Sequence, residues 1–97
     1  MKIHIVRHDD TDDTQLSVHL THKGALLKAV VDMVYEIEHH HTIEDESWHE
    51  LLEVAHNQLK ATKVKILDLE ISYTLLQDIG FEHGWYYTEI QEQTLHP

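Results

Sequence analysis

Hydrophobic and polar residues alternate in two short segments near the start of the chain. The first segment is centred on Ile3 and Ile5 and the second on Leu16 and Val18, and a two-residue period is typical of strands with one buried face. The run 9–13 between them consists of four aspartates and one threonine, whose short polar side chains favour turns. The pattern therefore predicts a β-hairpin.

The next two segments have the 3.6-residue period of amphipathic helices. A first helix is predicted near 22–38, with Thr21 as its N-cap. A second helix is predicted near 48–60, where Ser47 and Glu50 have the spacing of a capping box. Both helices are expected to bury their apolar faces against the rest of the domain.

A third helix and a last strand complete the predicted order. Asp68 fits the N-cap of this helix and Gly80 its C-terminal stop, while 63–66 is compatible with a short strand or with the first helical turn. Aromatic and β-branched residues from Trp85 to Leu95 indicate a strand. We predict an α+β domain of order ββαααβ, in which the hairpin and the last strand form a small antiparallel sheet with three helices on one face.

The length and composition bound the class of protein. The 97 residues correspond to a single domain, 1–97, with one modest core. The chain has no cysteine, which excludes disulfides and thiolate chemistry. No apolar run approaches the roughly 20 residues of a membrane span, and the start Met-Lys-Ile-His lacks the core of a signal peptide. We expect a soluble, cytoplasmic protein without a membrane partner.

Negative charge is concentrated in two stretches. The net charge is −11, and the segment 29–59 has eight acidic residues but no Lys or Arg. The segment 66–97 adds six acidic residues, again without Lys or Arg. Because such an excess opposes compaction, we interpret it as a means of solubility, repulsion or capture of a cationic partner. It disfavours direct binding of nucleic acid, whose phosphates would meet a negative surface.

Two segments carry a family resemblance: residues 1–8, which end in Val-Arg-His, and residues 20–24, Leu-Thr-His-Lys-Gly. The first resembles the opening strand of the histidine phosphatase (phosphoglycerate mutase-like) superfamily, and the second resembles a later segment of that superfamily. The resemblance implies that His8 is a phosphate-accepting nucleophile and Arg7 a phosphate clamp. Against this chemistry, Asp9 stands where that family has a glycine, and Arg7 is the only arginine. The chain also has about half the length that such a layered α/β fold needs. We therefore expect no enzyme, and a divergent phosphohydrolase module is the alternative.

A second resemblance is to small acidic accessory proteins encoded by bacteriophages. It is carried by the segment 17–29, Ser-Val-His-Leu-Thr-His-Lys-Gly-Ala-Leu-Leu-Lys-Ala. This resemblance implies a functional class and no particular site residues. Several members of the class inhibit host defences by presenting carboxylates in place of nucleic-acid phosphates. A phage-encoded protein of this kind would act in the cytoplasm of the host.

Eleven histidines raise the question of a metal site. The best ligand set is His49, Glu53 and His56, which share one stripe of the predicted second helix. That stripe lies away from the apolar face of the helix, so we expect a solvated polar surface and predict neither a metal nor a cofactor. The run 39–41 is three consecutive histidines, which can bind nickel or zinc adventitiously.

The leading hypothesis is a non-enzymatic acidic inhibitor that occupies a basic, nucleic-acid-handling site on another protein. The predicted partner-binding residues are Asp32, Glu36, Glu38, Glu44, Asp45, Glu46, Glu50 and Glu53. A structural or dimerising protein whose acidity serves solubility is a further alternative, and it allows a homo-oligomer. Trp85, Tyr86 and Tyr87 are expected to pack in the core, with an exposed binding patch as their alternative role.

Overall fold

The computed structural model describes residues 1–96 and has the predicted α+β architecture. Its elements are β1 (Lys2–Asp9), β2 (Thr14–His19), α1 (His22–His40), α2 (Glu46–Lys60), α3 (Ile66–His83) and β3 (Tyr87–Thr94). This order, ββαααβ, confirms the element types read from the hydrophobic periods. Within residues 1–96, no helix combines the length and the hydrophobicity that crossing a bilayer requires.

The sheet has the strand order β2-β1-β3, and both pairings are antiparallel. The turn between β1 and β2 is closed by Asp10, whose Oδ1 accepts hydrogen bonds from the backbone N–H groups of Asp12 and Asp13 at 2.8 and 2.7 Å. Because side chains alternate along a strand, β1 presents His8 to the helices and Arg7 to the opposite face. The sheet therefore has one covered face and one open face.

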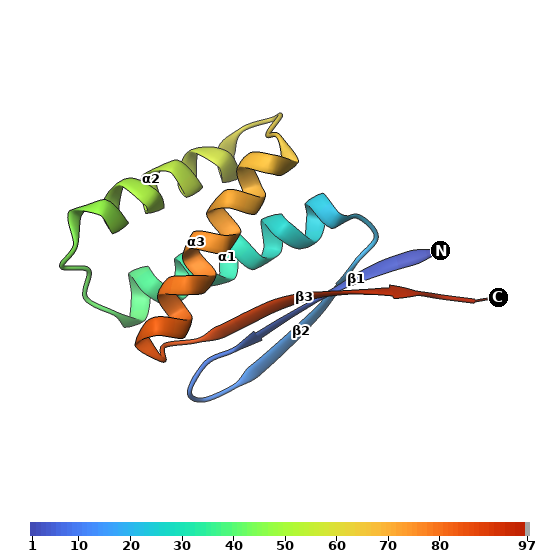
Figure 1. Ribbon diagram of the computed structural model, residues 1–97, viewed down its shortest axis with the longest axis horizontal. Coiled ribbons are helices and arrows are strands. Elements are labelled where there is room, and N and C mark those ends of the chain that lie inside the picture. The colour runs from blue at the N-terminus through green and yellow to red at the C-terminus, as the bar shows by residue number, and fades with distance from the viewer. Residues whose placement is uncertain (97) are drawn as a thin grey trace.

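The helices form the other layers of the molecule (Figure 1). α1 lies along the sheet, α3 packs on α1 and contacts β3, and α2 packs on the two other helices. The sheet extends beyond the helices as an arm that carries both ends of the chain (Figure 1). The principal extents of 49 × 32 × 18 Å reflect this elongated shape.

The main core lies between the sheet and the helices. α1 contributes most of it, since Leu26, Val30, Met33 and Ile37 are fully buried. Further buried residues come from the other elements, namely Val6, Leu52, Ala55, Leu69, Leu76, Ile79 and Tyr86. The apolar faces predicted for the helices are therefore the faces that pack.

The start of α2 differs from the predicted capping box. The helix begins at Glu46, and its N-cap is Asp45, whose Oδ1 accepts hydrogen bonds from the backbone N–H and the hydroxyl of Ser47. Asp is as good an N-cap as Ser, and here it lies two residues further toward the N-terminus. The side chain of Glu50 is thus free of the capping role and lies exposed.

The limits of α3 also need correction. The helix begins at Ile66 rather than after Asp68, and it continues through Gly80 to His83. The left-handed residue that ends it is Gly84, with φ of 65°. Gly80 is required for another reason, because a Cβ at this position would overlap the ring of Tyr86.

The aromatic residues after α3 divide between core and surface. Tyr86 is buried and its hydroxyl donates a hydrogen bond to the carbonyl of Leu76. The Trp85 ring is half-buried and stacks on His41 and His83, with ring centroids 4.0 and 4.7 Å apart. Tyr87 is exposed. The expected core packing therefore applies to Tyr86 and partly to Trp85, but not to Tyr87.

Candidate functional site

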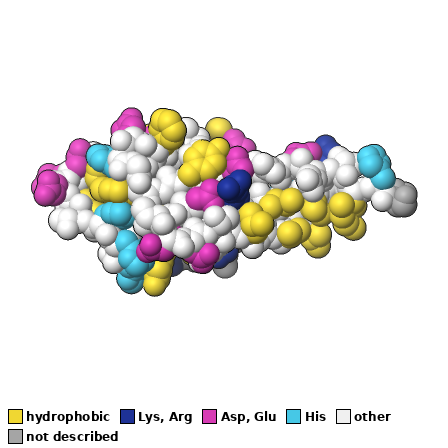
Figure 2. Space-filling view, turned by 90° about the horizontal axis from the view of Figure 1, so that it is seen from below, with side chains coloured by type: hydrophobic (Ala, Val, Ile, Leu, Met, Phe, Trp, Pro, Cys, Tyr) yellow, Lys and Arg dark blue, Asp and Glu magenta, His cyan; other side chains and the backbone are white. Residues whose placement is uncertain are grey.

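An exposed acidic surface lies at the end of α1, in the loop that follows and along α2. Six exposed carboxylates form this acidic surface: Glu38, Glu44, Asp45, Glu46, Glu50 and Glu53. Acidic side chains stand out at the left-hand end in Figure 2, which is the end where Figure 1 places the start of α2. The segment 29–59 has no Lys or Arg, and the nearest lysine in the chain, Lys60, lines a hollow with Glu38 and Glu53 at the end of α2.

Two of the predicted partner-binding residues do not belong to this surface. The carboxylate of Asp32 is mostly covered and accepts a hydrogen bond from the Lys28 ammonium at 2.9 Å. Glu36 is only 7% exposed. The reason is that α1 is covered by the sheet on one side and by two helices on another, so its free stripe passes through Tyr35 and Glu38 instead.

The acidic surface is held in place by local contacts. Glu38 pairs with His56 across to α2, with 2.7 Å between Oε1 and Nε2. Hydrogen bonds from Ser47 hold the pKa of Asp45 below its usual value, so this carboxylate is ionised at neutral pH. The helix fixes the spacing of Glu46, Glu50 and Glu53. The negative charges therefore occupy defined positions.

An apolar hollow lies beside the acidic surface, between α2 and α3. It has a volume of about 400 Å³, and its lining includes Val54, Ile71 and Leu75, all exposed. Val54 follows Glu50 by one helical turn, so charge and apolar surface adjoin on α2. The hollow was not predicted from the sequence. Val54 could have indicated it, because this apolar residue lies outside the apolar face of its helix.

His49, Glu53 and His56, the alternative metal ligands, line a different hollow of about 560 Å³ together with Glu38. His49 and Glu53 are exposed, while His56 is engaged by Glu38. The helix stripe predicted from the sequence thus exists on the surface. Its best-defined contact is the hydrogen bond between Glu38 and His56, which joins two helices, rather than a set of converging donors.

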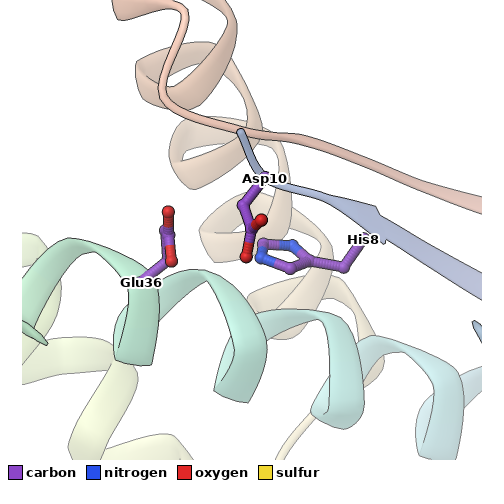
Figure 3. Close-up of side chains that lie close together, drawn as sticks. All are labelled: His8, Asp10 and Glu36. Carbon is purple, nitrogen blue, oxygen red and sulfur yellow. The ribbon is translucent and has the colours of Figure 1, made fainter. Parts of the chain in front are cut away.

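Converging donors occur instead where the β-hairpin meets α1. Within residues 1–96, His8, Asp10 and Glu36 place one possible ligand atom each within 4.8 Å of the others. Figure 3 shows the His8 ring and the Asp10 carboxylate facing each other, with Glu36 beside them on α1. His8 and Glu36 are buried, and Asp10 is half-buried. This cluster was not predicted from the sequence, because Glu36 is far from His8 and Asp10 in the chain and was placed on the surface.

The structure separates the two residues that the phosphatase resemblance implies. His8 is buried under the helices, whereas Arg7 projects from the open face and pairs with Asp9 at 3.0 Å. The guanidinium of Arg7 is thus already paired with the carboxylate of Asp9, and the sheet lies between Arg7 and the His8 ring. A phosphoryl group on His8 would therefore lack the predicted clamp.

The open face of the sheet is a second unusual surface. Leu16, Val18 and Leu20 are largely exposed and lie beside the half-buried Ile3 and Ile5. Figure 2 shows hydrophobic side chains gathered along the arm, at the end of the molecule opposite to the start of α2. Acidic and apolar surfaces are thus separated along the length of the molecule.

Comparison with known protein families, with curated proteins and with solved structures finds no match to this chain.

Proposed function

We propose that this protein is a non-enzymatic acidic binding protein that occupies a basic, nucleic-acid-handling site on another protein. The observation that carries the proposal is the acidic surface itself: six exposed carboxylates on one end of the molecule, in a segment without Lys or Arg. A rigid row of negative charges on α2 suits a groove that normally receives phosphates. Inhibition of a host defence protein by a phage-encoded protein is the setting that the resemblance of 17–29 supports.

The two adjoining surfaces of α2 have different tasks in this proposal. The exposed charges act at long range and accelerate the encounter with a basic partner. The apolar hollow around Val54, Ile71 and Leu75 excludes water once the surfaces meet and slows dissociation. A partner that fits has a basic rim next to an apolar projection.

A pull-down from host lysate tests the proposal, with variants that separate position from total charge. The surface variant carries Glu44→Gln, Glu46→Gln, Glu50→Gln and Glu53→Gln, and it leaves the Asp45 cap in place. The matched control neutralises four exposed acids elsewhere: Asp12→Asn, Asp13→Asn, Asp78→Asn and Glu82→Gln. Both variants change the net charge from −11 to −7 by removing four negative charges.

We expect the native chain and the control to capture a nucleic-acid-binding protein, and the surface variant to fail to capture it. Added DNA or RNA should displace it, because the two ligands compete for one site. Equal capture by both variants would mean that only the total charge matters, and the proposal would fail. Circular dichroism must show the same helix content in all three proteins.

A dimerising protein is a second candidate, and the open sheet face favours it. Charged residues on this face, within the described chain, are Arg7, Asp9 and Glu89, so it is nearly neutral although the molecule is strongly acidic. Two copies could pack these faces while their acidic ends stay apart. Sedimentation should then show a dimer that Val18→Ser weakens and Leu67→Gln, at another exposed apolar site, does not. A monomer at all concentrations would exclude this candidate.

A further inference from the structure

We propose that His8, Asp10 and Glu36 bind a first-row transition-metal dication such as Zn²⁺. Imidazole nitrogens and carboxylate oxygens are ligands that such ions take in proteins. The site is separate from the acidic surface and from the stripe His49, Glu53 and His56. It joins the β-hairpin to the end of α1 (Figure 3).

The geometry requires only small movements. When three donor atoms lie within 4.8 Å of one another, some point lies within about 2.8 Å of all three, compared with Zn–N and Zn–O bonds of roughly 2.0–2.2 Å. Each donor therefore has to move by less than about 1 Å. Glu36 has a long side chain, and Asp10 belongs to a turn, so both can make this adjustment.

The burial of an acidic group without a strong cationic partner supports the site most strongly. Glu36 is 7% exposed, and His40 and His41 approach its carboxylate oxygens only to 3.8 and 3.6 Å, beyond hydrogen-bond length. The Nε2 atom of His41 is buried and has no hydrogen-bond partner within the described residues. A buried charge is costly unless it is paired or binds a metal, and a cation here would pair with the Glu36 carboxylate.

Contacts behind the cluster orient its donors. The Nδ1 atom of His8, a residue only 4% exposed, lies 2.7 Å from the Thr88 hydroxyl, which leaves Nε2 for the ion. The Oδ1 atom of Asp10 is engaged by two backbone N–H groups, and its Oδ2 atom remains available. Such second contacts fix ligand orientation in metalloproteins.

A route from solvent exists on the hairpin side. A surface hollow of about 410 Å³ is lined by Asp10, Trp85 and Tyr86 among others. Because Asp10 belongs both to this hollow and to the cluster, solvent reaches the cluster at Asp10. The hollow also leaves room for a water molecule on the bound ion.

Titration of the metal-free full chain with ZnCl₂, followed by calorimetry and by thermal unfolding, tests the site. We expect one tight equivalent, a raised thermal midpoint that chelator reverses, and at least tenfold weaker binding in Glu36→Gln and in Asp10→Asn. Two controls address adventitious binding: His39→Ala with His40→Ala, and His49→Ala with Glu53→Gln and His56→Ala. Both controls should keep the tight equivalent.

An independent readout protects the test against a variant that fails to fold. Addition of Co²⁺ to the native chain should produce paramagnetic shifts at His8 and Glu36 and leave His49 unshifted. The proposal would be overturned if the native chain bound no Zn²⁺ tightly. It would also be overturned if the control variants lost the tight equivalent while Glu36→Gln and Asp10→Asn kept it. The same holds if Glu36→Gln binds Zn²⁺ as tightly as the native chain does, because Glu36 would then not be a ligand.

Discussion

Gly80 lies inside α3 because the ring of Tyr86 occupies the space that a side chain would need. The ideal Cβ position overlaps three atoms of that ring. This close approach lets the segment after α3 fold back over the helix, and it fixes Tyr86 against the core. A sequence pattern cannot distinguish such a glycine from a helix stop, because both lie near the end of an apolar period.

We predict that Gly80→Ala destabilises the protein by roughly 1–3 kcal/mol, because an added methyl group overpacks the contact with Tyr86. Chemical denaturation measures the effect. In a Tyr86→Leu background the same substitution should cost much less, since the clashing ring is gone. An equal cost in both backgrounds would show that the helix, rather than the ring, sets the requirement for glycine.

Buried tyrosines make stability depend on alkaline pH. Burial raises the pKa of Tyr86, and burial also raises the pKa of Tyr73, relative to the ordinary value of 10.0. The folded state thus favours the protonated phenols, and this contribution is complete below pH 10. It is lost as the pH rises above 10, because the unfolded chain then ionises more readily than the folded one. The denaturant midpoint of the native protein should fall as the pH is raised from 8 to 11. The midpoint of Tyr86→Phe should fall less over the same range.

Among the elements, the helices show which part of the fold a hydrophobic pattern determines. The 3.6-residue period gave the buried faces of α1 and α2 correctly, because burial of apolar area contributes most to the free energy of packing. The predicted end of α2 at residue 60 is correct, but the start of α2 and both ends of α3 were displaced by two residues or more. The cause is that Asp45 and Ser47 are both good caps, and Gly80 and Gly84 are both possible stops. The choice between equivalent local signals is made by tertiary contacts.

We predict that Val30→Ala and Leu52→Ala each destabilise by roughly 1–4 kcal/mol, as expected for buried apolar side chains. Val30 is 0% and Leu52 4% exposed. Their neighbours Val31 and Val54, 42% and 50% exposed, provide matched controls in the same helices. Val31→Ala and Val54→Ala should change stability by less than about 0.5 kcal/mol. Similar costs within either pair would mean that the assigned helix face is wrong.

At the scale of the whole molecule, the acidic surface and the open face of the sheet lie at opposite ends. The acidic surface lies at the α1–α2 end, and the apolar open face of the sheet lies on the arm that carries the termini (Figures 1 and 2). The sequence predicted the charge excess, the hairpin and the three helices. It did not predict that Glu36 is buried or that His8 and Asp10 meet it, because these depend on how α1 is enclosed by the sheet and the other helices.

The most direct test of the proposed function is the association rate with a purified captured partner, measured by stopped flow as a function of ionic strength. Exposed charges act over a screening length of about 8 Å at physiological ionic strength. The native chain should therefore associate fast at low salt and markedly more slowly at high salt, with a flattened dependence in the Glu44, Glu46, Glu50 and Glu53 amide variant. The control with four neutralised acids elsewhere should retain most of the native dependence. Identical salt dependence in the native chain and the surface variant would contradict the account, because binding would then not depend on the acidic surface.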